Sequence, residues 1–349
     1  MASRHTLSDE SHHEKALGGK LLASVSRSFY LTLKALPREL REPISLAYLL
    51  ARTADTIADT TAVRTSTRLN LLATFDQLIQ SGTAASIETE EFAQQVRQEF
   101  ATHQSDPAER SLMEHTQESL AWLGTMSGEV LANIRAVLAT IISGQQADLT
   151  RFPSDSELHS LTTAAELDDY TYRVAGCVGE FWTKLCFSEM HSVFAPGITP
   201  ALACELGIRF GKGLQLVNIL RDIGKDAKLG RCYLPSEQWQ ANGLTLEQIQ
   251  QNPARLRPVW NSWFETAAEH LRAGLAYLQK IEHGKLRYAT ALPLILGIRT
   301  LAHLRKATDA QLLAGVKVSR LDVAKVLLDT TLSNSPDGLA RLFDKQWSA

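Results

Sequence analysis

Two stretches far apart in the chain each carry a pair of aspartates separated by four residues. The pairs are Asp55 with Asp59 and Asp222 with Asp226. In a helix this spacing places both carboxylates on one face, where they repel each other by roughly a few tenths of a kcal/mol unless a cation lies between them. Asn218 precedes Asp222 by one turn. Carboxylate and amide oxygens are the ligands that Mg²⁺ prefers, so these five residues predict magnesium binding.

Arginines accompany both acidic pairs. Arg52 lies three residues before Asp55, Arg221 directly precedes Asp222, and Arg231 follows shortly afterwards. Guanidinium groups form charge-assisted, bidentate hydrogen bonds with phosphate oxygens, and bound Mg²⁺ is commonly completed by substrate phosphates. We therefore expect a diphosphate ligand. The cations would stabilise a departing diphosphate and so favour ionisation of an allylic carbon–oxygen bond.

Other interpretations of the same residues have less support. One aspartate pair is common on a solvated helix, whereas two pairs, each among apolar residues with an arginine nearby, are much less often accidental. The chain has no P-loop, because the sequence from Gly211 to Gly213 continues into Leu-Gln-Leu. A di-iron site requires Glu-x-x-His on core helices, and this spacing occurs at Glu10 to His13 in the polar N-terminal segment, with no second copy on a predicted core helix.

The composition of the 349 residues limits the classes of protein. Hydrophobic residues make up 44% and the net charge is −2, which is typical of a soluble globular protein and argues against a broad nucleic-acid surface. The four cysteines form no CxxC pair, so neither a zinc site nor a disulfide framework is predicted and a reducing cytoplasm fits. The polar N-terminus lacks the apolar core of a signal peptide. No uncharged apolar run reaches 18 residues, so we expect no membrane span.

Hydrophobic residues recur at helical spacing along most of the chain, so an all-α fold is predicted. The predicted helices cover residues 16–34, 39–60, 67–80, 88–103, 107–144, 158–187, 199–226, 245–251, 255–282, 287–307 and 320–333. Breaks are predicted where proline and glycine cluster, as at 335–338. Because no break is long enough for a linker, we expect a flexible lead-in over 1–15 and a single helical domain over 16–349.

Several motifs resemble those of the squalene/phytoene synthase family. Residues 26–29 (SRSF) are similar to an early family signature, and the two acidic stretches resemble its two aspartate-rich motifs. Residues 170–179 (YTYRVAGCVG) and 230–235 (GRCYLP) are similar to two further segments. The resemblance runs from Ser26 to the helix around Pro293 and is nearest to bacterial squalene synthases.

This resemblance implies an isoprenoid synthase fold, a helical bundle with both aspartate motifs at the mouth of a central apolar cavity. It also implies head-to-head condensation of two farnesyl diphosphates through a cyclopropyl (presqualene) diphosphate, followed by reduction to squalene with NADPH. Phytoene and dehydrosqualene synthases, the alternatives, lose a proton and use no NADPH. The implied cofactors are Mg²⁺ and NADPH. The implied setting is cytoplasmic, with peripheral contact at the inner face of the membrane, because the product partitions into lipid.

The resemblance also assigns site residues. Tyr170 and the four aspartates are the implied catalytic residues. The implied substrate-binding residues are Ser26, Arg27, Phe29, Tyr48, Arg52, Val174, Gly176, Gln215, Asn218, Arg221, Arg231 and Tyr233.

Alternatives remain open for some of these residues and for the whole chain. Tyr170 could instead satisfy a buried hydrogen bond, and Tyr48 could serve in helix packing. Gly176 and Gly179 would permit close approach of either a helix or a ligand. A helical isoprenoid-binding protein without turnover is the alternative from another class.

Overall fold

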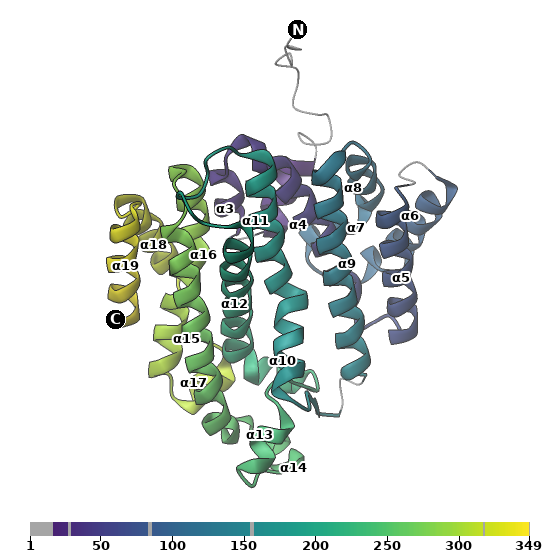
Figure 1. The fold of residues 1–349 in the computed structure, drawn as a ribbon. Coiled ribbons are helices and arrows are strands. Elements are labelled where there is room, and N and C mark those ends of the chain that lie inside the picture. Colours follow the sequence, from purple (N-terminus) through teal and green to yellow (C-terminus); the bar gives the residue numbers. More distant parts are fainter. Residues whose placement is uncertain (1–16, 27–28, 83–85, 154–156, 317, 349) are drawn as a thin grey trace. The chain divides into compact units, whose positions relative to one another are not determined.

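The computed structural model describes residues 17–26, 29–82, 86–153, 157–316 and 318–348, with the backbone alone at 320. The expected flexible lead-in over 1–15 and the predicted substrate-binding residue Arg27 lie outside the described residues. Figure 1 shows that the described chain is almost entirely helical, which confirms the all-α prediction.

Most helices are α-helices, and two strands of two residues each pair in parallel. The N-terminal helices are α2 (Leu22–Ser26), α3 (Phe29–Ala35), α4 (Arg38–Asp59), α5 (Thr65–Ser81), α6 (Ile87–Glu99), α7 (Pro107–Glu114), α8 (Thr116–Leu123) and α9 (Gly128–Arg151). They are followed by β1 (His159–Ser160), α10 (Ala164–Thr171), α11 (Cys177–Glu189), α12 (Pro200–Lys228), β2 (Arg231–Cys232), α13 (Ser236–Ala241) and α14 (Leu246–Gln251). The C-terminal helices are α15 (Arg257–Gln279), α16 (Gly284–Lys306), α17 (Asp309–Ala314), α18 (Arg320–Leu332) and α19 (Pro336–Ser348).

The contacts divide the chain into two compact units. One comprises Met1–Tyr30 and Arg41–Leu138, and the other comprises Leu31–Leu40 and Ala139–Ala349. The first unit therefore carries the first aspartate motif on α4, and the second unit carries the second motif on α12. The single helical domain and its central cavity stay predictions.

Several predicted helices differ from the structure: the one over 158–187, for example, begins with β1 and continues as α10 and α11. Two other differences have local reasons. The helix predicted over 107–144 is three helices, α7, α8 and α9, and the last begins at Gly128, whose φ of 56° favours glycine. The predicted break at 335–338 is instead the start of α19. Pro336 is the first helical residue there, where its missing N–H would have no partner in any case.

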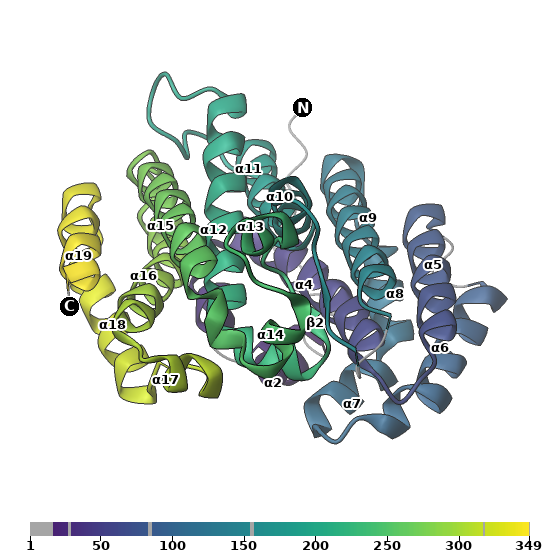
Figure 2. The same cartoon turned by 90° about the horizontal axis from the view of Figure 1, so that it is seen from below.

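The core of the second unit is built around the 29-residue helix α12. Thr199 caps its start by accepting a hydrogen bond from the Leu202 N–H, and Pro200 occupies the first turn. α12 packs against α11, α15 and α16, as Figure 2 shows from below. Gly179 of α11 meets Gly207 of α12 so closely that a Cβ on Gly179 would lie 1.9 Å from the Gly207 oxygen. One alternative for Gly179 is thus resolved, because the neighbour that needs the close approach is a helix.

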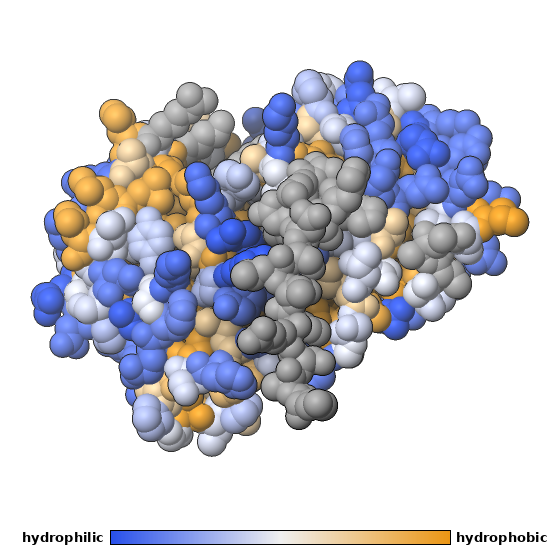
Figure 3. Space-filling view, turned by 90° about the horizontal axis from the view of Figure 1, so that it is seen from above, coloured by the Kyte–Doolittle hydropathy of each residue, from blue (hydrophilic) through white to orange (hydrophobic). Residues whose placement is uncertain are grey.

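No helix among the described residues is long and apolar enough to cross a membrane. The exposed leucines of α18, namely Leu321, Leu328 and Leu332, share one face of that helix because their spacing is close to whole helical turns. Figure 3 shows an apolar patch on the side of the second unit where α18 lies, amid a largely polar surface.

Candidate active site

The first aspartate motif lies near the C-terminal end of α4 in the first unit. Asp55 is partly exposed, Asp59 is exposed, and the Arg52 Nη1 lies 3.8 Å from an oxygen of Asp55. The opposite face of the helix is buried: Leu49 and Ile57 are fully inaccessible to solvent. The local amphipathic pattern thus places both carboxylates on the side of α4 away from its buried face.

A carboxylate that sequence reasoning missed holds Arg52 in place. Glu109 of α7 accepts hydrogen bonds from Nε (3.0 Å) and Nη2 of Arg52 and, at 2.6 Å, from the Thr56 hydroxyl. Burial lowers the pKa of Arg52, but the hydrogen bond and charge of Glu109 outweigh it, so that this pKa is raised. Glu109 is 57 residues from Arg52 along the chain, and no local spacing signals the pair.

Three predicted substrate-binding residues, Ser26, Phe29 and Tyr48, lie near one another in the first unit. The ring of Phe29 stacks on that of Tyr48, with centroids 5.3 Å apart, and the Tyr48 hydroxyl donates to the Val25 carbonyl at 3.3 Å. Ser26 is buried, and its hydroxyl donates to the Leu22 carbonyl. These contacts place the residues in one cluster and account for packing; their contact with substrate stays a prediction.

The second aspartate motif occupies one face of α12 in the second unit. Arg221 donates to both oxygens of Asp222, from Nε at 2.9 Å and from Nη2 at 2.6 Å. One turn earlier, the Asn218 amide donates to Gln215 at 3.3 Å. Burial, with the neighbouring charge of Asp222, raises the pKa of Asp226 to about 7. An anion so placed is stabilised by an added cation.

The carboxylate oxygens of Asp222 and Asp226 are suitable ligands for Mg²⁺. Asp222 keeps unshared lone pairs beyond the two hydrogen bonds from Arg221, and Asp226 presents a carboxylate that burial and a like charge disfavour. Among the described residues no three His, Cys, Asp or Glu side chains cluster as a ready-made metal site. Mg²⁺ typically uses one or two protein carboxylates and takes its other ligands from water and phosphate.

Tyr170, Arg231 and Tyr233 meet in a buried cluster in the second unit. The rings of Tyr170 and Tyr233 stack with centroids 4.6 Å apart. The Tyr233 hydroxyl donates to Asp148 of α9 at 3.0 Å, and Arg231 Nη1 donates to the same carboxylate at 3.3 Å. The turn at Gly230 (φ 72°) leads into β2, where pairing with β1 fixes Arg231 opposite His159.

Burial dominates the acid–base properties of the two phenols. It raises the pKa of Tyr170 and of Tyr233 far above the ordinary range, and the charge of Asp148 raises both further. Both therefore stay neutral at physiological pH, which makes the Tyr170 hydroxyl a hydrogen-bonding group and not a phenolate base. Asp226, Arg231 and Tyr233 also line a narrow pocket whose free volume, about 10 Å³, is room for about one water molecule.

Val174 and Gly176 lie in a wide π-helical turn, η3 (Tyr172–Gly176), between α10 and α11. Gly176 faces α12: a Cβ there would lie 3.2 Å from the Cγ of Lys212. Val174 faces Gly144 of α9, where a Cβ would lie 3.3 Å from the valine Cγ1. Both positions have helix-packing contacts, and their contact with substrate stays a prediction. Such π-turns are frequent at functional sites.

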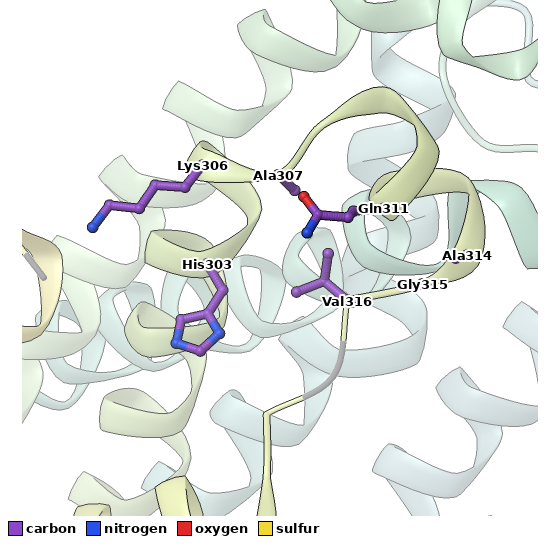
Figure 4. Close-up of a pocket in the computed structure, with 7 residues that line it drawn as sticks. All are labelled: His303, Lys306, Ala307, Gln311, Ala314, Gly315 and Val316. Atoms are coloured by element: carbon purple, nitrogen blue, oxygen red, sulfur yellow. The ribbon is translucent and has the colours of Figure 1, made fainter.

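A larger pocket of the second unit lies elsewhere. Figure 4 shows it between the end of α16, α17 and residues 315–316, with a volume of about 530 Å³. His303, Lys306 and Gln311 are among its lining residues, and none of the predicted site residues is. Volume alone therefore does not identify the site; the chemistry is concentrated at the aspartate motifs and the tyrosine cluster.

The all-α fold matches that of solved squalene synthase structures. A solved squalene synthase, TcSQS, in complex with the ligand E5700 superposes with a TM-score of 0.74 at 20% identity, over 93% of this chain and 87% of that one. A dehydrosqualene synthase solved with a ligand gives a TM-score of 0.57 at 20% identity, over 92% and 94% of the two chains.

The chain itself belongs to the squalene/phytoene synthase family, whose model matches residues 22–322. Members of this family are prenyl-transferring isoprenoid synthases.

The curated relatives include squalene, presqualene diphosphate and phytoene synthases. A squalene synthase from Nicotiana benthamiana is 26% identical over 81% of this chain and 62% of its own length. A presqualene diphosphate synthase from Rhodopseudomonas palustris is 30% identical over 64% and 63%. A bifunctional lycopene cyclase/phytoene synthase from Phaeosphaeria nodorum is 30% identical over 66% and 36%. The chain thus spans between about a third and just under two thirds of the length of these relatives.

Proposed function

We propose that this protein condenses two farnesyl diphosphates head to head to a cyclopropyl (presqualene) diphosphate and reduces that intermediate to squalene with NADPH. The observation that carries the proposal is that both aspartate motifs are present, each with an arginine held in place by a carboxylate. Arg52 is held by Glu109, and Arg221 by Asp222. Similarity to squalene synthases over 81% of the chain supports the choice of product.

Mg²⁺ would be held by Asp55 and Asp59 in one motif and by Asn218, Asp222 and Asp226 in the other. When bound, it supplies Lewis-acid stabilisation of the departing diphosphate. Arg52, Arg221 and Arg231 bind diphosphate oxygens, and the ion pairs that hold them lower the entropy lost when substrate binds.

Tyr170 contributes a neutral hydroxyl beside the reacting prenyl chains, because its raised pKa keeps the phenol protonated. Its stacking on Tyr233 orients that hydroxyl. Ser26, Arg27, Phe29, Tyr48, Val174, Gly176, Gln215 and Tyr233 complete the proposed substrate contacts.

The NADPH step separates this proposal from its closest alternatives. The cation formed from the cyclopropyl intermediate must be quenched, and hydride gives squalene whereas proton loss gives dehydrosqualene or phytoene. The 30% identical presqualene diphosphate synthase supports a second candidate, an enzyme that stops at the intermediate. The phytoene synthase relative supports a third, which takes geranylgeranyl diphosphate.

Product identification tests these candidates. Purified protein is incubated with Mg²⁺ and either farnesyl or geranylgeranyl diphosphate, with and without NADPH, and extracts are analysed by gas chromatography after phosphatase treatment. We expect the cyclopropyl alcohol or solvolysis products from farnesyl diphosphate alone and squalene after NADPH is added. A product that NADPH leaves unchanged, or preferred formation of phytoene, contradicts the squalene proposal and leaves head-to-head condensation standing.

A binder without turnover is tested separately. Thermal melting with Mg²⁺ and a non-hydrolysable farnesyl diphosphate analogue reports occupancy, since a ligand at 100 times its Kd stabilises the folded state by about 2.7 kcal/mol. Stabilisation without any product in the four reactions would identify a binding protein.

A further inference from the structure

Glu109 of α7 is a buried carboxylate to which the sequence patterns assigned no role. Asp106 caps α7, and Glu109 lies in the first turn, where the helix dipole favours a negative charge. Only 7% of the surface of Glu109 is exposed. A carboxylate so buried is costly unless it is paired and hydrogen-bonded. Arg52 and the Thr56 hydroxyl, both on α4, supply that pairing within the first unit.

Glu109 occupies one particular edge of the Arg52 guanidinium. A single oxygen of Glu109, Oε1, accepts from both Nε and Nη2 of Arg52. The remaining nitrogen, Nη1, lies 3.8 Å from an oxygen of Asp55, which is too long for a hydrogen bond. Arg52 is therefore hydrogen-bonded to a carboxylate that lies 57 residues away along the chain, and it forms only a loose ion pair with the aspartate that lies one turn away.

The second aspartate motif shows the other arrangement. Arg221 uses the same two nitrogens, Nε at 2.9 Å and Nη2 at 2.6 Å, to bind both oxygens of the adjacent Asp222. The side chains of Arg52 and Asp55 are each about a third exposed, which leaves them room to pair in the same way. A carboxylate that accepts from a guanidinium has fewer lone pairs for a metal ion, and the guanidinium charge repels that ion.

We propose that Glu109 is a positioning residue of the first aspartate motif: it takes the Nε–Nη2 edge of Arg52 and so prevents that guanidinium from competing with Mg²⁺ for Asp55. This inference rests on the proposed function in one respect, the assignment of Asp55 as a magnesium ligand. The same contact keeps the Nη1 end of Arg52 beside Asp55, where a diphosphate oxygen on the metal can accept a hydrogen bond from it.

Binding of Mn²⁺ tests the inference without turnover. Mn²⁺ prefers the same oxygen ligands as Mg²⁺, and electron paramagnetic resonance measures the ion that stays free in solution. The parent protein carries D222N and D226N, so that the second motif offers no carboxylate. E109Q and R52M are introduced into this parent singly and together. R52Q replaces R52M if R52M does not fold, because the glutamine amide can donate to the buried Glu109.

We expect E109Q to weaken Mn²⁺ binding about tenfold, because the ion must then displace the hydrogen bonds that Arg52 makes with Asp55. In proteins that already carry R52M, E109Q should change the dissociation constant by less than about twofold, since the guanidinium that Glu109 holds is absent. The matched control is E114Q, which removes one negative charge from an exposed position on the same helix. It should also change the dissociation constant by less than about twofold.

Two results would overturn the inference alone. One is an effect of E109Q no larger than that of E114Q. The other is an equal loss of Mn²⁺ affinity with and without Arg52, which would mean that Glu109 acts on the metal through its charge only. Mn²⁺ binding that D55N leaves unchanged would contradict the metal assignment and the inference with it. Wild-type protein that binds Mn²⁺ as expected, yet yields no product from either prenyl diphosphate, would contradict the proposed function alone.

Discussion

Gly179→Ala is expected to destabilise the second unit by forcing α11 away from α12. The added Cβ would lie 1.9 Å from the Gly207 oxygen, whereas ordinary contacts begin at 3.4 Å. The clash is with backbone, so no side-chain rotation relieves it. Overpacking of this kind costs about 1–3 kcal/mol, and alanine in a helix returns roughly 0.5–1 kcal/mol, which leaves a net loss of about 2 kcal/mol when the upper end applies.

The matched control is Gly284→Ala at the start of α16, where an added Cβ would have no neighbour within 4 Å. It should be neutral or slightly stabilising. The assay is urea unfolding followed by circular dichroism, with the free energy of unfolding compared at equal m-values. The reasoning is refuted if Gly179→Ala unfolds at the same midpoint as the Gly284→Ala control. Because α11 follows the turn that connects to Tyr170, turnover of the folded Gly179→Ala protein should fall as well.

Three further predictions concern the site and the pH dependence of stability. Replacing Asp55 or Asp222 by Asn should leave the melting temperature nearly unchanged, since the Asp222–Arg221 pair is about a third exposed and worth roughly 0–1 kcal/mol. Turnover should fall by orders of magnitude. Near-wild-type rates at saturating substrate would rule out these residues as metal ligands. Tyr170→Phe keeps the stacking on Tyr233, so we expect a large loss of kcat with little change in the melting temperature. Parallel losses of stability and rate would instead indicate that the Tyr170 hydroxyl serves the structure. Hydrogen bonds from Ser319 and Arg299 hold the pKa of Asp322 well below its ordinary value, so the contribution of Asp322 to the free energy of unfolding is present above about pH 4 and lost as the pH falls further. The difference in unfolding free energy between wild type and Asp322→Asn should therefore shrink from pH 6 to pH 3. A constant difference would show that the carboxylate does not titrate as inferred.

The sequence by itself determined the helical class and the placement of each aspartate pair. Both follow from local periodicity: apolar residues at helical spacing fix which side of α4 is buried, so Asp55 and Asp59 must point the other way. The resemblance of the motifs to a known family was equally readable, because it depends only on residue types and their order.

Helix ends were less predictable where one residue has two interpretations. Pro336 with Gly338 indicates a turn when read as a pair, yet a proline is also favoured at the first position of a helix, and packing of α19 on α16 favours the helix. The small two-stranded pairing of β1 and β2 was likewise invisible, since its strands are two residues long and about 70 residues apart.

Only the tertiary structure determined which side chains hold the predicted substrate-binding residues in place. Glu109 reaches Arg52 and Asp148 reaches Tyr233 across 57 and 85 residues of chain. In sequence each is an ordinary acidic residue on a helix, and nothing in the spacing distinguishes it from a solvated one. Burial makes the difference: once folding removes such a carboxylate from water, it must be paired, and the partner that folding brings to it becomes fixed in place.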